Sequence, residues 1–173
     1  MGKGLPRSLP GNLDQAQIVT KRIGLDGKSI NMTGASGVGW GTIPIEGLPE
    51  GNILFLGMAV NISFAGSGSE ANLGDTWNGD FSLGTTPVDD GTASGGDVDL
   101  VASQAIGPAS GEAVALTRAV STQTEHALIL DNTGGALEVN LNLLIDDADI
   151  SGDNIAINLG GFVSFSYIVL GDS

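Results

Sequence analysis

The chain has 173 residues, no cysteine, and 20 acidic against six basic residues, which gives a net charge of −14 at pH 7. A chain without cysteine has no disulfide and no thiolate nucleophile. So acidic a chain is also unsuited to nucleic acid or to an anionic membrane surface, because both are bound through Lys and Arg. A hydrophobic fraction of 41% predicts a folded core, and 28 glycines with only 5% aromatic residues predict short strands joined by tight turns.

Basic residues are concentrated at the beginning of the chain. Residues 1–28 hold five bases and two acids, whereas residues 29–173 hold one base, Arg118, and eighteen acids. Residues 1–16 contain Pro6, Pro10 and three glycines, a composition typical of an extended arm. We therefore predict an N-terminal arm over residues 1–16, a single domain over residues 17–173, and a positively charged docking region at their junction. The docking residues are Lys3, Arg7, Lys21, Arg22 and Lys28.

Beyond the arm, apolar and polar residues alternate with a period of two, which indicates half-buried β-strands. The predicted strands are residues 17–25, 51–64, 80–83, 97–103, 126–130, 137–143, 155–159 and 162–170, and residues 112–120 are assigned to a strand rather than a helical turn. Gly57, inside the second of these strands, predicts a β-bulge.

The segments between the strands are rich in glycine and small polar residues. The predicted loops are residues 33–42, 66–79 and 85–96, with a tight turn at residues 131–135 and a break at Gly160-Gly161. Many short strands at hairpin spacing, with no convincing helix, predict an all-β fold. We expect an antiparallel β-sandwich, for which an eight-stranded jelly roll is the simplest architecture.

The densest acidic cluster, residues 146–153, partly matches a calcium-binding loop. Its candidate ligands are Asp147, Asp149, Ser151 and Asp153. Asn158 stands where the closing bidentate Glu would be, and the flanking segments are predicted strands rather than helices. A hairpin turn whose side chains bond their own backbone is therefore the preferred interpretation, and we assign no metal and no other cofactor.

Catalytic constellations are not recognisable in the sequence. His126 is the only histidine, and its neighbour Glu125 would point to the opposite face of a strand. The glycines at residues 37–41 have neither the G-x-G-x-x-G spacing nor the lysine of a nucleotide-binding loop. We predict that the chain is not an enzyme.

Four acids lie on or next to a stretch rich in glycine, threonine and serine. Asp89, Asp90, Asp97 and Asp99 could supply the carboxylate pair of a glycoside hydrolase, but acids in such loops are ordinarily only solvated. Trp40 and Trp77 are the only tryptophans that could stack on a sugar. The alternative to sugar binding is that each tryptophan packs a loop against the sandwich.

Two segments of the C-terminal half carry a resemblance to a known class of protein. Residues 130–153 (LDNTGGALEVNLNLLIDDADISGD) and residues 163–171 (VSFSYIVLG) resemble the capsid decoration, or cement, proteins of tailed bacteriophages. The resemblance extends over residues 50–170 and lies in the style of the strands rather than in a ligand motif. It implies an acidic, cysteine-free β protein on the outer surface of a phage head, often a trimer, whose N-terminal arm reaches across the capsid or a neighbouring subunit.

The sequence thus leads to two functional expectations. In the first, the chain is made in the host cytoplasm and binds the major capsid protein on the outer surface of the assembled virion as a homotrimer. The alternative is a receptor- or glycan-binding module of a phage head fibre or tail. That alternative would place ligand contacts at Trp40, Trp77 and the loops at residues 66–79 and 85–96.

Overall fold

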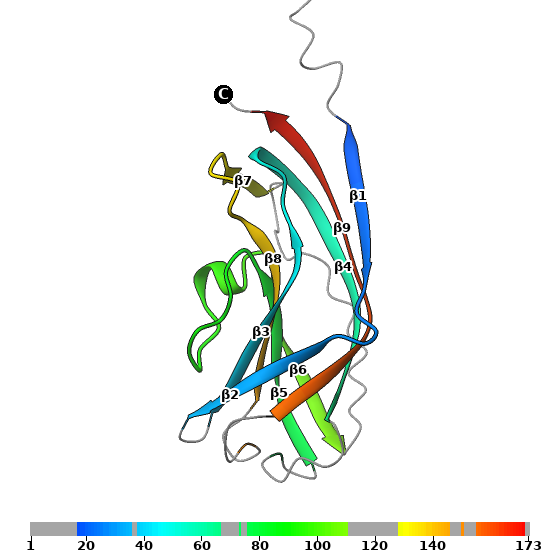
Figure 1. Ribbon diagram of the computed structural model, residues 1–173, viewed down its shortest axis with the longest axis vertical. Coiled ribbons are helices and arrows are strands. Elements are labelled where there is room, and N and C mark those ends of the chain that lie inside the picture. Colours follow the sequence, from blue (N-terminus) through cyan, green and yellow to red (C-terminus); the bar gives the residue numbers. More distant parts are fainter. Residues whose placement is uncertain are drawn as a thin grey trace, which may run out of the picture.

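The fold is all-β and antiparallel, as predicted. The computed structural model describes residues 17–35, 38–66, 73, 76–110, 128–145, 150 and 155–171. Within these ranges the chain forms nine strands and one 3₁₀ helix (Figure 1). They are β1 (Ile18–Gly24), β2 (Ser29–Ala35), β3 (Val38–Gly47), β4 (Gly51–Gly66), β5 (Thr76–Gly84), η1 (Gly95–Asp97), β6 (Val101–Ser110), β7 (Leu128–Asn132), β8 (Glu138–Ile145) and β9 (Ile155–Gly171).

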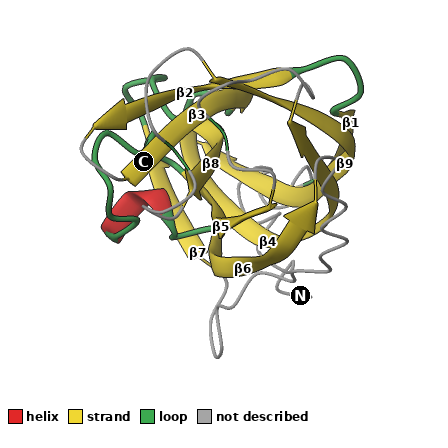
Figure 2. Cartoon of the chain, turned by 90° about the horizontal axis from the view of Figure 1, so that it is seen from below, coloured by secondary structure: helices red, strands yellow, loops and turns green. Residues whose placement is uncertain are grey.

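The strands follow the order β6-β5-β8-β3-β2-β9-β4-β7, with β1 paired to β9 outside this path. The sheet curls so that its two halves face each other (Figure 2). We call the half formed by β1, β9, β4 and β7 the β9 sheet, and the half formed by β3, β8, β5 and β6 the β8 sheet. Strand β2 belongs to both, because residues 29–32 pair with β9 and residues 33–35 pair with β3.

The pairing is nested along the chain. Strand β2 pairs with β9, β3 with β8, β4 with β7 and β5 with β6, all antiparallel. This is the connectivity of one long hairpin whose two arms run side by side and are wound into two layers. The additional pairs β4 with β9 and β5 with β8 complete the two layers.

The hydrophobic core lies between the two sheets. Along β4, every second residue from Met58 to Phe64 is buried, as the alternation in the sequence predicts. The rings of Phe64 and Phe81 lie 5.5 Å apart, centroid to centroid, and join β4 of one sheet to β5 of the other. At the other end of the core, Phe165 stacks between Phe55 and Tyr167. The core is mostly aliphatic, and these few rings connect its layers.

Two predictions about glycine-rich segments were wrong. Of residues 33–42, expected to be a loop, residues 33–35 belong to β2 and residues 38–42 to the antiparallel strand β3. Gly39 and Gly41 lie in β3, where a Cβ atom would overlap the side chains of Ile150 and Ile30 respectively. Glycine here allows two layers to approach closely rather than breaking a strand.

The break expected at Gly160-Gly161 is not a strand end, because β9 continues through it as one strand of 17 residues. Gly161 has a φ of 92°, and its N–H donates a hydrogen bond of 3.0 Å to the carboxylate of Asp26. A Cβ atom at Gly161 would overlap the carbonyl oxygen of Asn61 on β4. The glycine pair therefore lets β9 change partner from β2 to β1 without ending.

Other boundaries differ less from the prediction. The bulge at Gly57 is confirmed by a register shift between Phe55 and Gly57. Strand β6 begins at Val101 rather than at residue 97, because residues 95–97 form η1, and β5 already begins within the predicted loop of residues 66–79. Strand β7 ends at Asn132, two residues later than predicted, and residues 126 and 127 of the predicted strand lie outside the described residues. The predicted arm, residues 1–16, and residues 112–120 lie outside the described residues.

The change of partner along β9 is testable by substitution. We expect Gly161→Ala to lower the free energy of unfolding by more than the about 1–3 kcal/mol that a positive φ alone costs a residue with a side chain, since the new Cβ also meets Asn61. Gly47→Ala on β3 is the matched control, because a Cβ there meets no atom within 4 Å. Urea unfolding measures both variants, and equal stability of the two would contradict this account of β9.

Candidate docking surface

Strand β1 and the turn after it hold the three basic residues of the predicted docking region that the structure describes, Lys21, Arg22 and Lys28. Lys3 and Arg7 lie outside the described residues. Along β1 the side chains alternate between more and less exposed positions, so that Lys21 and Arg22 point to opposite faces of the sheet.

Lys21 points towards the β8 sheet and forms an ion pair with Glu46 of β3. The Glu46 carboxylate, which accepts the hydrogen bond, raises the pKa of Lys21 above its usual value. Since β1 and β3 are not hydrogen-bonded neighbours, this ion pair joins the two sheets where no strand bridges them. The charge of Lys21 is therefore compensated within the chain, which weakens its expected part in docking.

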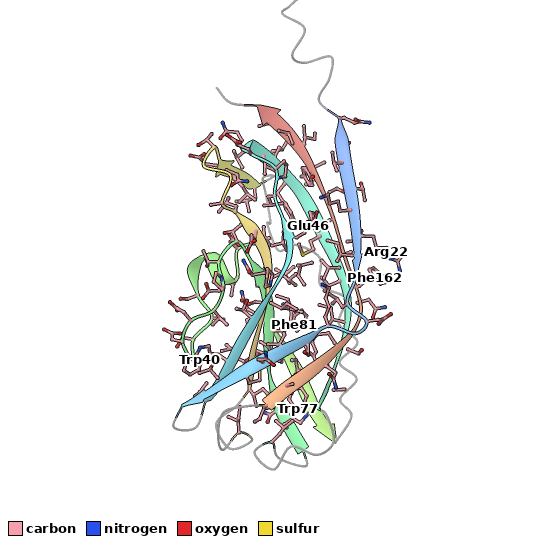
Figure 3. The ribbon with its side chains drawn as sticks, viewed as in Figure 1. Arg22, Trp40, Glu46, Trp77, Phe81 and Phe162 are labelled. Atoms are coloured by element: carbon pink, nitrogen blue, oxygen red, sulfur yellow. The ribbon has the colours of Figure 1, made fainter. Side chains whose placement is uncertain are left out.

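Arg22 points outwards and lies flat on the β9 sheet. Its guanidinium carbon is 3.7 Å from the centroid of the Phe162 ring on β9 (Figure 3). A cation over an aromatic face at an exposed site is worth about 0.5–1 kcal/mol, so the contact orients Arg22 without removing it from solvent. Lys28 ends the β1–β2 turn, where its N–H bonds to the Leu25 carbonyl and its own carbonyl accepts from Leu159.

The outer face of the β9 sheet, on the side away from the core, is nearly free of charge. Its side chains follow from the strand register and from the alternation of buried and exposed positions. They are Ile18, Thr20 and Arg22 on β1; Asn158, Phe162, Ser164, Ser166, Ile168 and Leu170 on β9; Asn52, Leu54, Leu56, Ala59, Asn61, Ser63 and Ala65 on β4; and Ile129 and Asp131 on β7. Among these described positions, Arg22 and Asp131 are the only charged residues.

Acidic residues gather instead on the segment between β5 and β6, which includes η1. This segment and β1 lie on opposite sides of the molecule in both views (Figures 1 and 2). It carries Asp89, Asp90, Asp97 and Asp99. The described bases Lys21, Arg22 and Lys28 thus lie away from the acidic segment, on a side that also carries two acids, Asp26 and Glu46.

The carboxylates of this acidic segment hold its own backbone. Asp99 accepts hydrogen bonds from the N–H and the hydroxyl of Thr85, at 2.8 and 2.6 Å. Asp97 accepts from the Thr86 hydroxyl at 2.6 Å, and Asp90 accepts from the N–H of Thr92 at 2.7 Å. These contacts are those of loop structure, and they account for three of the four acids that the sequence offered for glycoside hydrolysis; the fourth, Asp89, is exposed.

Asn142 is a residue whose role the sequence did not predict. It alternates with leucines on β8 and was expected to face solvent, yet it is only 1% exposed. Its amide donates to the carbonyls of Thr86 and Asp97, at 3.1 and 3.0 Å, and accepts from the N–H of Val88 at 3.0 Å. The acidic segment is thereby fastened over the outer face of the β8 sheet.

The two tryptophans lie in different environments. Trp77, on β5, is 1% exposed and belongs to the core, so it cannot present a ring to a sugar. Trp40, on β3, is half-buried. Of the aromatic platform expected for a glycan-binding module, the described structure thus leaves only Trp40 accessible in part.

Several candidate residues lie outside the described ranges. They are His126 and the four calcium candidates Asp147, Asp149, Ser151 and Asp153. Within the described ranges, no group of three or more His, Cys, Asp or Glu residues could hold a metal ion. No helix in that part of the chain is long and apolar enough to cross a membrane.

Comparisons with known proteins do not identify the chain. No protein-family model matches it, and neither a curated protein nor a solved structure matches it significantly.

Asn142 provides a test of how the acidic segment is fastened. We expect Asn142→Ala to lower the free energy of unfolding by about 3 kcal/mol, because it leaves buried backbone groups without a partner, and to speed hydrogen exchange at the Val88 amide. Asn140→Ala is the matched control, since Asn140 lies on the same strand, is also buried, and donates only to the carbonyl of Glu138. Slow exchange at Val88 in the Asn142 variant would contradict this role.

Asp99 provides a test that depends on pH. Burial raises the pKa of Asp99 above its ordinary value of 3.8, although the hydrogen bonds from Thr85 oppose this shift. An acid whose pKa is raised by folding stabilises the fold below its unfolded pKa, and this contribution is lost as pH rises through the folded pKa. Asp99→Asn keeps a partner for both Thr85 groups but has no charge. We therefore expect the variant to be at least as stable as wild type at pH 7. As pH falls towards 3.8, we expect the stability of wild type to rise relative to that of the variant.

Asp99→Ala is the control for that experiment, because it loses both hydrogen bonds as well as the charge. We expect it to be less stable than Asp99→Asn at pH 7, as measured by thermal unfolding. If the two variants are equally destabilised, the hydrogen bonds do not hold the segment as described.

Proposed function

We propose that this chain is a structural virion protein that binds the outer surface of an assembled bacteriophage capsid and stabilises it, as decoration proteins do. The resemblance of residues 130–153 and 163–171 to such proteins motivates the proposal. The observation that carries it is the charge asymmetry of the fold, because all three described bases lie beside β9 and the acidic segment lies on the opposite side. A chain with one basic side and one acidic side is suited to attach by the first and to face solvent with the second.

We infer further that the fold is a jelly roll. The nested pairs β2–β9, β3–β8, β4–β7 and β5–β6 support this inference, because winding one long hairpin into two layers produces them. Jelly rolls of eight strands are common in viral capsid and lectin domains. The fold therefore agrees with a virion protein but does not by itself select one function.

The proposed mechanism is mechanical rather than chemical. Copies of the chain, as a homotrimer, would bridge adjacent subunits of the major capsid protein. The predicted arm, residues 1–16, would attach together with Arg22 and Lys28, whose charges have no carboxylate partner among the contacts described above. Binding to the assembled shell and not to free subunits stabilises the shell by mass action.

Co-sedimentation with capsids that lack the protein tests this proposal. We expect deletion of residues 1–16 to abolish binding, and the double variant Arg22→Gln/Lys28→Gln to weaken it about tenfold or more at low salt, with a smaller effect at high salt because surface charges are then screened. Circular dichroism should show an unchanged β fold in both variants.

The matched control neutralises the opposite side of the molecule. Asp89→Asn/Asp90→Asn changes the net charge by the same magnitude on the exposed acidic segment, and we expect it to leave capsid binding intact. Full binding by the deletion and by the basic-residue variant would refute the docking role of β1 and the arm. A glycan that binds the wild-type chain and competes with capsids would favour the receptor-binding alternative.

A further inference from the structure

The large hydrophobic side chains that remain exposed are confined to one sheet. In the part of the chain that the structure describes they are Ile18 (59% exposed), Leu56 (41%), Ile129 (63%), Val169 (37%) and Leu170 (52%). All five belong to strands of the β9 sheet, and none to the β8 sheet. Four of them lie on its outer face, whereas Val169 pairs with the buried Ile53 and so points to the core side near the end of β9. Single exposed apolar residues are common on protein surfaces, whereas a gathered group marks an interaction site.

Four apolar residues on the outer face of this sheet are in direct register. Ile18 of β1 pairs with Ile168 of β9, Ile168 with Leu54 of β4, and Leu54 with Ile129 of β7. Directly opposite residues of an antiparallel pair have Cβ atoms about 4.5–5.5 Å apart. The four side chains, which we call the apolar row, thus form a continuous band across the whole width of the β9 sheet.

The sequence around the apolar row has the pattern of strands that are covered on both faces. Residues 53–56 (ILFL), 128–130 (LIL) and 167–170 (YIVL) are uninterrupted apolar runs. Elsewhere the same strands alternate, as at residues 58–64 of β4. A continuous apolar run is typical of a strand buried on both sides, and alternation is typical of one buried on a single side. Of the described chain, only the core side of these runs is covered.

The net charge of the chain limits which surface of a second copy could cover the outer side of these apolar runs. A chain with a net charge of −14 repels its own copies, so copies can associate only through a surface with few acids. The outer face of the β9 sheet is such a surface. Its described acids are Asp131, at the end of β7, and Asp26, whose carboxylate lies beside Gly160, eight residues along β9 from Ile168. Leu56 and Leu170 extend the apolar row on this face, and many of the side chains beyond them are small, such as Thr20, Ser166 and Ala59.

The size of the face is sufficient for a stable contact. Beside the nine residues of β9 from Phe162 to Leu170 lie about nine of β4, the seven of β1 and the five of β7. At about 3.3 Å along a strand and about 4.8 Å between strands, the plane area is on the order of 500 Å², and the accessible area is larger because it follows the side chains. A standard interface uses about 800 Å² of accessible surface on each partner.

We propose that the apolar row is the centre of an interface between copies of this chain, in which each copy contacts its neighbours through the outer face of its β9 sheet. Arg22 and Asp131 lie at opposite edges of this face, on β1 and β7, and so at its polar rim. The inference deepens the homo-oligomer proposed above but does not depend on the capsid as partner.

The oligomeric mass of the purified full-length chain tests this interface. We expect native mass spectrometry and light scattering at micromolar concentration to give an integer multiple of the 17.4 kDa chain mass. Ile18→Glu/Ile129→Glu places acids at both ends of the row. Like charges in an interface cost several kcal/mol, so we expect the dissociation constant to rise by about 100-fold or more and the monomer to dominate.

The matched control adds the same charge elsewhere. Thr92→Glu/Ser103→Glu alters two exposed positions, on the acidic segment and on β6, and should keep the oligomeric mass of wild type. A wild-type monomer, or an oligomer that survives the row variant, would overturn the proposal.

A second measurement does not depend on a disruptive substitution. Because the chain contains no cysteine, Ile129→Cys introduces a single site for a spin label. We expect dipolar coupling between labels on neighbouring copies, and none for the exposed control Thr92→Cys. Absence of coupling in an oligomer of unchanged mass would place the contact elsewhere and refute the assignment of the row.

The experiments distinguish failure of the self-association proposal from failure of the capsid-binding proposal. If the row variant is monomeric but Arg22→Gln/Lys28→Gln still binds capsids as wild type does, the interface holds and the docking proposal fails. If wild type is monomeric and the row variant loses capsid binding, the row contacts the capsid protein instead, and the self-association proposal is wrong.

Discussion

Strand β9, the last described strand, pairs with the first, β1, and the rest of the fold depends on it. It is the only described strand that hydrogen-bonds to three others, since it pairs with β1, β2 and β4. This requires β9 to change partner at Gly160-Gly161, where the space beside the strand is filled by β4 and by Asp26. The constraint is steric, and it explains why two glycines can stand inside a strand of 17 residues instead of ending it.

The two sheets are joined differently along their length. At one point they are continuous, because β2 pairs with β9 and then with β3. Farther along β1, no strand bridges the sheets, and the Lys21–Glu46 ion pair spans the opening. Both side chains remain about one-third exposed, so the pair contributes at most about 1 kcal/mol. An inward-pointing lysine on an edge strand also discourages pairing of that edge with another chain.

The sequence predicts the strands wherever one face is buried and the other is solvated, as in residues 51–64. The prediction is wrong where a strand is covered on both faces or where glycine serves close packing. Asn142 follows the same alternation but is buried, because a segment more than 40 residues away in the chain closes over it. Gly39 and Gly41 resemble loop glycines because their close neighbours, Ile150 and Ile30, are not evident from local pattern. The positions of the bases on β1 were predicted, whereas the partner of Lys21 depends on the tertiary fold.

The outer faces of the two sheets differ in a way that bears on association. The β8 sheet is covered by its own polar segment, whose backbone is satisfied by Asn142. The β9 sheet instead presents aliphatic side chains, each worth about 1.5–3 kcal/mol when fully buried. Association costs about 4–15 kcal/mol in lost freedom of motion, so the four residues of the apolar row, partly buried already, cannot meet this cost alone. The acid-poor remainder of the face must also make contact, which is why its low charge matters as much as the row itself.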